Sequence, residues 1–226
     1  MKEFLKNLIY NKLVAKLILK KILRIHTLSY KLSGIYSSII NDGSHPKHKI
    51  IDYFSWYLDN INTSDIIIDI GCNKGYMANI MSQKAKQVYG IEILNEFVEY
   101  ANKNYKSNNL AFYCADATNF DYKDLAYIPT VFTLSNVLEH IDNRVQFLKD
   151  IQKSLRSEVK FLIRVPMIDR EWIVLYKKQL GLEYRLDKTH FIEYTFEKFK
   201  QEINASGLII ENYHIKWGEI YAICKQ

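Results

Sequence analysis

The sequence predicts an α/β protein with a mostly parallel β-sheet that ends in an antiparallel hairpin. From residue 65 onwards, short apolar stretches rich in Ile, Val and Phe alternate with stretches of helical periodicity. Strands that are buried on both faces of a parallel sheet have this continuous apolar character, and helices supply the crossovers between them. The last two apolar stretches, which begin at Leu208 and Ile220, follow each other too closely for a crossover, so we expect them to pair antiparallel.

The predicted elements of this region come in a regular order. Strands are expected at residues 66–70, 87–91, 110–114, 131–135 and 160–165. Helices are expected at residues 75–84, 95–106, 142–155 and 196–206, the last with Thr195 as its N-cap. Five parallel strands and the terminal hairpin add up to a sheet of seven strands.

A chain of 226 residues is long enough for one domain with a large core and short for two. We divide it into an N-terminal helical extension or cap at residues 1–62 and an α/β domain at residues 63–226. A loop at residues 41–46, which is rich in turn-forming residues, interrupts the extension. The helical stretches of the extension are expected at about residues 3–25, 28–41 and 47–60.

The positive charge of the chain is concentrated at its N-terminal end. The formal net charge is +6, and residues 1–31 hold eight Lys or Arg and one acid, a net of +7. The remainder therefore carries 23 positive and 24 negative side chains, a net of −1. A nearly neutral domain argues against a nucleic-acid partner.

Cysteine usage and the N-terminal pattern indicate a cytoplasmic location. Cys72, Cys114 and Cys224 are far apart and show no metal-binding spacing, so we expect reduced thiols. Lysines interrupt every apolar run of the N-terminal stretch, which therefore predicts neither a secretion signal nor a membrane span.

The N-terminal stretch is amphipathic on a helical wheel. Its basic face is formed by Lys2, Lys6, Lys12, Lys16, Lys20 and Arg24. The opposite face is formed by Phe4, Leu8, Val14, Ile18, Leu19, Ile22 and Ile25, while Leu5, Ile9, Leu13 and Leu17 intrude on the basic face. Two interpretations stay open. Residues 1–26 lie on anionic lipid as a peripheral contact at the inner face of the membrane, or they pack as a cap or dimerise.

A glycine-containing turn follows the first strand of the α/β region. The strand ends in Asp69, and Gly71 and Gly75 stand in the turn that opens the next helix. A ligand can approach the backbone closely where Cβ is missing, and ligands bind at the carboxyl ends of the strands in such sheets. The spacing matches neither G-x-G-x-x-G nor a phosphate-binding P-loop, which disfavours a nicotinamide-dependent oxidoreductase.

The segment Asp69-x-Gly71-x-Asn73-x-Gly75 resembles the first motif, D-x-G-x-G-x-G, of the class I S-adenosylmethionine-dependent methyltransferases. Asn73 replaces the middle glycine, and asparagine tolerates a positive φ better than most residues. The resemblance covers about residues 63–226 and implies a Rossmann-like fold with S-adenosyl-L-methionine as cofactor. The cofactor-binding residues that it implies are Asp69, Gly71, Cys72, Asn73, Gly75, Tyr76, Glu92, Ile93, Asp116, Ala117, Ser135 and Asn136.

Two further acids follow the second and third strands. The resemblance implies that Glu92 accepts hydrogen bonds from ribose hydroxyls and that Asp116 binds the adenine amino group, with Ala117 supplying a backbone N–H. Together with Asp69, these acids stand at three successive strand ends. We therefore expect the three carboxylates to converge on one adenosyl group.

The segment "LSNVLEHI" resembles a family segment that places Glu139 and His140 at the reaction centre. A hydroxyl acceptor needs a general base, for which His140 is the first candidate and His190 the second. Adjacent residues on a helix point about 100° apart, so we expect no metal ion at Glu139 and His140.

After the fifth strand, Arg164, Arg170, Tyr176 and Arg185 predict contacts with the acceptor, because basic and aromatic side chains suit sugars and anionic groups. The segment His45-Pro46-Lys47-His48 resembles one that stands just before the domain in related bacterial methyltransferases, which implies a cofactor lid or an acceptor contact at His45, Lys47 and His48. A resemblance to methyltransferases of surface-glycan synthesis implies O- or N-methylation of a small-molecule or glycan acceptor. The alternatives are a quinone or metabolite methyltransferase and a methyltransferase-like scaffold without catalysis. The oligomeric state stays open.

Overall fold

The computed structural model describes residues 10–42, 45–155 and 158–226. The chain forms two compact units. The smaller unit consists of Met1–Asp52 and Trp172–Tyr184, and the larger consists of Tyr53–Glu171 and Arg185–Gln226. Each unit is considered by itself below.

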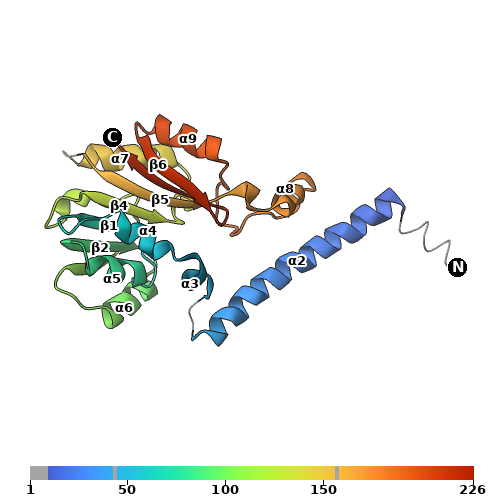
Figure 1. Cartoon of the computed structure of the whole chain (residues 1–226), viewed down its shortest axis with the longest axis horizontal. Coiled ribbons are helices and arrows are strands. Elements are labelled where there is room, and N and C mark those ends of the chain that lie inside the picture. The colour runs from blue at the N-terminus through green and yellow to red at the C-terminus, as the bar shows by residue number, and fades with distance from the viewer. Residues whose placement is uncertain (1–9, 43–44, 156–157) are drawn as a thin grey trace. The chain divides into compact units, whose positions relative to one another are not determined.

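The larger unit is built on a sheet of seven strands in the order β3-β2-β1-β4-β5-β7-β6 (Figure 1). Strands β1 to β5 are parallel, whereas β7 runs antiparallel to both β5 and β6. This arrangement confirms the predicted mostly parallel sheet with its C-terminal hairpin. The strands are β1 Ile66–Ile70, β2 Gln87–Glu92, β3 Leu110–Cys114, β4 Val131–Ser135, β5 Lys160–Pro166, β6 Ile209–Lys216 and β7 Glu219–Lys225.

Helices lie on both sides of this sheet (Figure 1). Helices α4 and α5 pack on each other, and so do α7 and α9. The fully buried β1 and the stacked rings of Phe132 and Phe161, 5.4 Å apart, lie in the core between these layers. The helices are α4 Tyr53–Asp59, α5 Tyr76–Ser82, α6 Asn95–Asn104, α7 Arg144–Ser154 and α9 Phe196–Ala205, with short 3-10 turns η1 Tyr122–Asp124, η2 Leu138–His140 and η3 Ile168–Arg170. The Thr195 hydroxyl accepts a hydrogen bond from Lys198 N, which confirms it as the N-cap of α9.

The smaller unit contains one long helix, α2 Lys12–Ile40, where the sequence predicted two. The predicted break after residue 25 is wrong. His26 and Thr27 continue the helix, in which the Thr27 hydroxyl donates to Leu23 O at 3.0 Å. The predicted helical residues 3–9 lie outside the described residues, so Lys2, Phe4, Leu5, Lys6, Leu8 and Ile9 of the wheel have no structural account.

The third predicted helical stretch of the extension is interrupted. A single helix at 47–60 was predicted, but the chain forms α3 Lys47–Ile51 and then α4, because Asp52 adopts a left-handed conformation with φ of 46°. Helix α8 Trp172–Gln179 was not predicted. Within the smaller unit, its Lys177 donates a hydrogen bond of 2.9 Å to the hydroxyl of Thr27.

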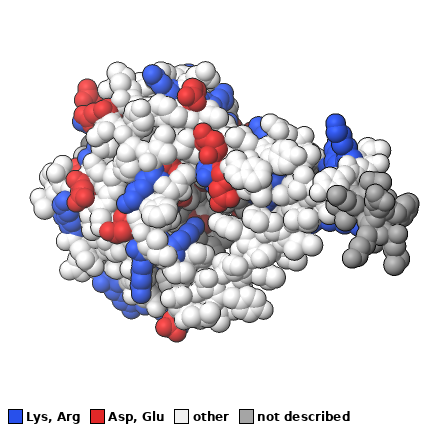
Figure 2. Space-filling model, turned by 45° about the vertical axis from the view of Figure 1, so that its right-hand side comes forward, with Lys and Arg blue, Asp and Glu red and all other residues white. Residues whose placement is uncertain are grey.

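The charged side chains of the face shown in Figure 2 are mixed in sign, and the three cysteines form no disulfide. Basic and acidic side chains are interspersed on the face shown in Figure 2. Cys72 and Cys224 are buried, Cys114 is exposed, and all three are free thiols. Across the described ranges, we find no helix with the length and hydrophobicity that crossing a bilayer requires.

Candidate functional site

The turn after β1 adopts left-handed backbone conformations at three alternate residues. The φ angles are 64° at Gly71, 51° at Asn73 and 80° at Gly75. A Cβ on Gly71 would lie 2.6 Å from Cγ2 of Val137, so the glycine is required by packing as well as by conformation. Asn73 occupies the middle position, and its side-chain oxygen accepts from Lys74 N at 2.8 Å, a local hydrogen bond of the kind that lets asparagine adopt this region.

Glu92, the last residue of β2, fixes this turn. One carboxylate oxygen accepts from Asn73 N at 2.9 Å, and the other accepts from Leu94 N at 3.0 Å. A carboxylate has about four acceptor positions, so these two bonds leave further lone pairs for a ligand.

A cavity of about 620 Å³ opens at the carboxyl ends of the parallel strands. This volume lies within the range of small-molecule sites. The cavity brings together five of the residues predicted to bind the cofactor, and they come from the ends of three neighbouring strands: Gly71, Glu92, Ile93, Asp116 and Ala117.

Sequence reasoning missed most of the residues that line this cavity. The lining residues without a predicted role include Thr118, Asn119, Val137, Ile141, Asp142, Asn143, Gln146, Phe147 and Asp150. Of these residues, only Thr118 and Asn119 could have been predicted from the sequence. Ser, Thr and Asn shortly after an Asp favour turns closed by side-chain hydrogen bonds.

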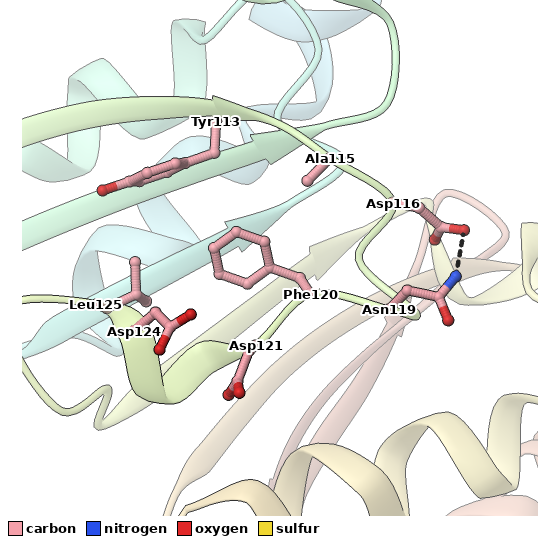
Figure 3. Close-up of a pocket in the computed structure, with 8 residues that line it drawn as sticks. All are labelled: Tyr113, Ala115, Asp116, Asn119, Phe120, Asp121, Asp124 and Leu125. Atoms are coloured by element: carbon pink, nitrogen blue, oxygen red, sulfur yellow. Dashed lines mark hydrogen bonds between the residues drawn. The ribbon is translucent and has the colours of Figure 1, made fainter.

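Asp116 lies in the wall of the cavity and is held by such a turn. Its carboxylate accepts from the backbone and hydroxyl of Thr118 and from the side chain of Asn119, and the last of these bonds is drawn in Figure 3. The Thr118 hydrogen bonds are the main reason that the pKa of Asp116 lies below its ordinary value. The carboxylate is therefore ionised and oriented before any ligand binds.

A second cavity, of about 380 Å³, shares Asp116 and Asn119 with the first. The rings of Tyr113 and Phe120 lie along it, and Asp121 and Asp124 line the side where the chain enters η1 (Figure 3). The two cavities therefore adjoin at the end of β3.

Asp69 does not line the cavity. Its side chain is buried and accepts a hydrogen bond of 2.7 Å from the Thr133 hydroxyl on β4. Burial raises the pKa of Asp69 to about 7. The cavity thus brings together Glu92 and Asp116 without Asp69, and the convergence of all three carboxylates on one ligand stays a prediction.

Several other predicted cofactor residues are not among those that line the cavity. Cys72 is buried in the turn, and Tyr76 is exposed with its ring 5.1 Å from that of Phe54. The side chain of Asn136 donates to Glu219 at 3.3 Å, and Asn136 has a φ of 56°. Asn73, Gly75 and half-buried Ser135 are also absent from the lining.

Of the predicted catalytic residues, His140 lines the cavity, whereas Glu139 and His190 lie behind it. The rings of His140 and His190 meet edge to face with centroids 4.5 Å apart. Burial lowers the pKa of His140, and the nearby His190 lowers it further. Burial raises the pKa of Glu139 to about 8.

The predicted acceptor-binding arginines have partners within the larger unit. Arg164 is buried against the ring of Tyr53 and pairs with Glu219 at 3.4 Å. Arg170 pairs with Glu193, and Arg185 donates to His190 O at 3.0 Å. These arginines therefore hold the unit together.

The remaining predicted acceptor contacts belong to the smaller unit. His45 Nδ1 accepts from Lys47 N at 3.1 Å at the start of α3, and the rings of His45 and His48 meet edge to face. The ring of Tyr176 lies 6.1 Å from that of Trp172 on α8. None of them is among the residues that line the cavity.

The family model described as a methyltransferase domain matches residues 68–163, which run from β1 into β5 and include most of the cavity wall. Over these residues the chain carries a methyltransferase domain. The resemblance of the first motif is thereby confirmed at the level of the family, its fold and its cofactor.

Curated relatives match this methyltransferase domain at low identity. An uncharacterized protein of Methanocaldococcus jannaschii is 29% identical over 45% of this chain and 41% of its own length. An uncharacterized RNA methyltransferase of Clostridium tetani is 39% identical over 23% of this chain and 11% of its own length. The carboxy-S-adenosyl-L-methionine synthase of Helicobacter pylori is 23% identical over 79% of this chain and 77% of its own length. The chain thus spans less than half the length of the first two relatives.

Solved structures share the methyltransferase fold. An S-adenosylmethionine-dependent methyltransferase from Clostridium acetobutylicum superimposes with a TM-score of 0.59 at 14% identity, covering 88% of this chain and 98% of the other. At this identity the likeness shows the fold alone.

Proposed function

We propose that the larger unit binds S-adenosylmethionine in the cavity of about 620 Å³ and transfers its methyl group to an acceptor beside His140. The observation that supports this most is that Glu92 and Asp116, from successive strand ends, line one cavity with the backbone of Gly71. Such acids suit the hydroxyls and the amino group of an adenosyl moiety. Asp69 does not line the cavity. Its proposed role is therefore indirect: it would stabilise the turn that follows β1.

The cofactor, when bound, supplies an electrophilic methyl carbon on a sulfonium sulfur. The chain has to hold the acceptor about 3 Å from that carbon and in line with the breaking bond. His140 lies on the wall, and its lowered pKa favours the neutral imidazole, the form that accepts a proton from a hydroxyl acceptor.

We expect replacement of Glu92 by alanine to weaken binding of S-adenosylhomocysteine, the demethylated product, by about 10- to 100-fold. Hydrogen bonds to a charged group are worth about 1.5–3 kcal/mol, and the turn at Asn73 loses its anchor as well. Isothermal titration calorimetry on the full chain measures this directly. Glu99→Ala is the matched control, because Glu99 is exposed on α6 and bonds only locally to Asn95. Absence of product binding to the wild type, or equal affinity in Glu92→Ala, would contradict the proposal.

For the acceptor we propose a small molecule or a glycan, methylated on oxygen or nitrogen. The resemblance to surface-glycan methyltransferases supports this class, and on the face that Figure 2 shows the basic and acidic side chains are interspersed, an arrangement that suits a polyanion less than a basic patch does. Transfer of radiolabelled methyl groups should be compared between a glycan and metabolite fraction and total RNA from the source cells. Label in the first fraction is the expected result, and label in RNA alone would overturn the acceptor class.

We also propose that α2 contacts anionic lipid. Lys12, Lys16 and Arg24 stand on this helix with exposed apolar side chains such as Leu17 and Ile25, a composition that suits a membrane surface. We expect the full chain to float with vesicles that contain anionic lipid, and binding to weaken with salt. Leu17→Asn together with Ile25→Asn should reduce flotation several-fold, while Ile209→Asn, an exposed apolar change on β6, should not. Equal flotation of all three proteins would refute the lipid contact.

A further inference from the structure

We propose that Glu139, His140 and His190 form a binding site for a divalent transition-metal ion. Each of the three offers one ligand atom, and these atoms all lie within 4.8 Å of one another. Ligand atoms around a tetrahedral ion with bonds of about 2.1 Å are roughly 3.4 Å apart. The three side chains therefore need to close by about 1 Å to hold an ion, a movement within reach of side-chain rotation.

An independent observation points to a ligand at this place. Glu139 is fully buried, and within the described residues neither oxygen of its carboxylate accepts a hydrogen bond. A buried polar group without a partner costs free energy and calls for an explanation in each structure where it occurs. His190 Nε2 lies 4.0 Å from Glu139 Oε1, too far for a hydrogen bond and close enough for a shared ion.

The two histidines are held by their Nδ1 atoms. His190 Nδ1 lies 3.0 Å from Glu193 Oε1, and His140 Nδ1 lies 2.9 Å from the Thr189 hydroxyl. Histidines that bind metals usually have a carboxylate or another oxygen on the second ring nitrogen, which orients the ring. Both Nε2 atoms are thus the positions at which an ion would bind.

The carboxylate partner of His190 is itself fixed. Glu193 accepts from Leu186 N at 2.6 Å and pairs with Arg170. On the other side, the Thr189 hydroxyl donates to Asp187 at 2.9 Å. Outer contacts of this kind keep the residues that touch a metal in one orientation, and here they hold the loop around residue 190.

The local backbone explains how adjacent residues share one site. In a regular helix, Glu139 and His140 would point about 100° apart. Here they belong to the single 3-10 turn η2, which follows left-handed Asn136 and an irregular Val137. The loop that carries His190 is attached to this turn, because Phe191 N donates to Glu139 O at 2.8 Å. The sequence-based expectation of no metal assumed a regular helix, and that assumption is wrong.

The ligand set indicates which ions fit. Two imidazoles and one carboxylate suit Zn²⁺, Co²⁺, Mn²⁺ or Fe²⁺, whereas Mg²⁺ and Ca²⁺ prefer oxygen ligands alone. Three protein ligands leave coordination positions open, and His140 lines the cavity. Resting on the proposed function, we infer that the ion would bind the acceptor hydroxyl and lower its pKa, so that the proton passes to solvent water, while the new O–CH3 bond replaces the S–CH3 bond and S-adenosylhomocysteine leaves; His140 would then act as a ligand and not as a base.

The test is Zn²⁺ and Co²⁺ binding to the full chain after treatment with a chelator. We expect one ion per chain by calorimetry, and with Co²⁺ a visible absorption spectrum that indicates mixed nitrogen and oxygen ligands. Glu139→Gln and His190→Ala should each weaken binding at least tenfold, and Glu193→Gln should weaken it by about 10-fold through loss of orientation. His45→Ala and His214→Ala are the controls, because both histidines lie outside the cluster, and they should bind as the wild type does.

The outcomes separate this proposal from the proposed function. Thermal melts verify that each variant is folded, and product binding is measured on the same samples. If S-adenosylhomocysteine binds but no ion binds, or if Glu139→Gln and His190→Ala bind metal as the wild type does, the metal site is refuted while the cofactor site stands. If the ion binds and the product does not, the metal site stands and the proposed methyl transfer fails.

Discussion

Replacing Gly71 by alanine is expected to lower the stability of the larger unit by about 2–5 kcal/mol and to weaken S-adenosylhomocysteine binding at least tenfold. The left-handed φ of 64° costs an alanine about 1–2 kcal/mol. The new Cβ would also lie 2.6 Å from Val137 Cγ2, and such crowding costs about 1–3 kcal/mol. Because Gly71 lines the cavity, relief of the clash by a shift of the turn changes the site itself.

Gly207→Ala is the matched control for this prediction. Gly207 also has a positive φ, of 87°, but a Cβ there would meet only Gln152 Oε1, at an ordinary 3.8 Å. We expect it to lose about 1–2 kcal/mol and to bind the product normally. Adding Val137→Ala to Gly71→Ala should restore part of the binding. Urea denaturation and calorimetry measure both quantities, and equal destabilisation by the two glycine substitutions would show that the contact with Val137 does not matter.

The sheet was predictable because its central strands are buried on both faces. β1 and β4 begin and end where the apolar runs do, and so does β3, although it is a half-exposed edge strand. β6 was predicted too short, since after Ile210 its residues are mostly polar and exposed. This strand lies at the edge of the sheet, where charged and polar side chains are common, and only its pairing with β7 identifies it as a strand.

The helical extension could not be predicted as well. The continuity of α2 through His26 and Thr27 has no marker in the sequence, and the break at Asp52 depends on one left-handed residue. Helix α8 has a weakly amphipathic sequence, and its Lys177 bonds to Thr27, which is about 150 residues away along the chain. Contacts of that range leave no periodic pattern in the sequence.

In the candidate site, too, the sequence pattern predicted the position of some residues and could not predict that of others. Strand ends placed Glu92 and Asp116 at one edge of the sheet, and both line the cavity. Asp69 is the last but one residue of β1, and its buried side chain accepts from the Thr133 hydroxyl on β4 instead. The approach of His190 to Glu139 depends on an irregular turn and a loop contact, so no spacing in the sequence could indicate it.

The buried carboxyl of Asp69 should make the stability of the larger unit depend on pH. Burial raises the pKa of Asp69 from 3.8 to about 7, against the opposing effect of the Thr133 hydroxyl. Between these values the folded state binds more protons than the unfolded state, so the free energy of unfolding falls as the pH rises. The stabilisation is fully present below pH 3.8, and its loss is complete once the pH passes about 7. At about 1.4 kcal/mol per pKa unit, the loss is on the order of 4 kcal/mol.

The quantity to measure is the difference in free energy of unfolding between the wild type and Asp69→Asn from pH 4 to pH 8. The amide that this substitution introduces does not titrate, so the difference isolates the contribution of Asp69, whatever fixed cost a buried amide adds. Asp116→Asn is a control of opposite sign. The pKa of Asp116 is lowered by Thr118, so its contribution is present above its unfolded pKa and lost as the pH falls, and it is small because the carboxylate is exposed. A difference that stays constant from pH 4 to pH 8 would mean that Asp69 is ionised throughout. In that case a positively charged group would have to face the second carboxylate oxygen of Asp69, in addition to the Thr133 hydroxyl at the first. This second oxygen accepts no hydrogen bond within the described residues.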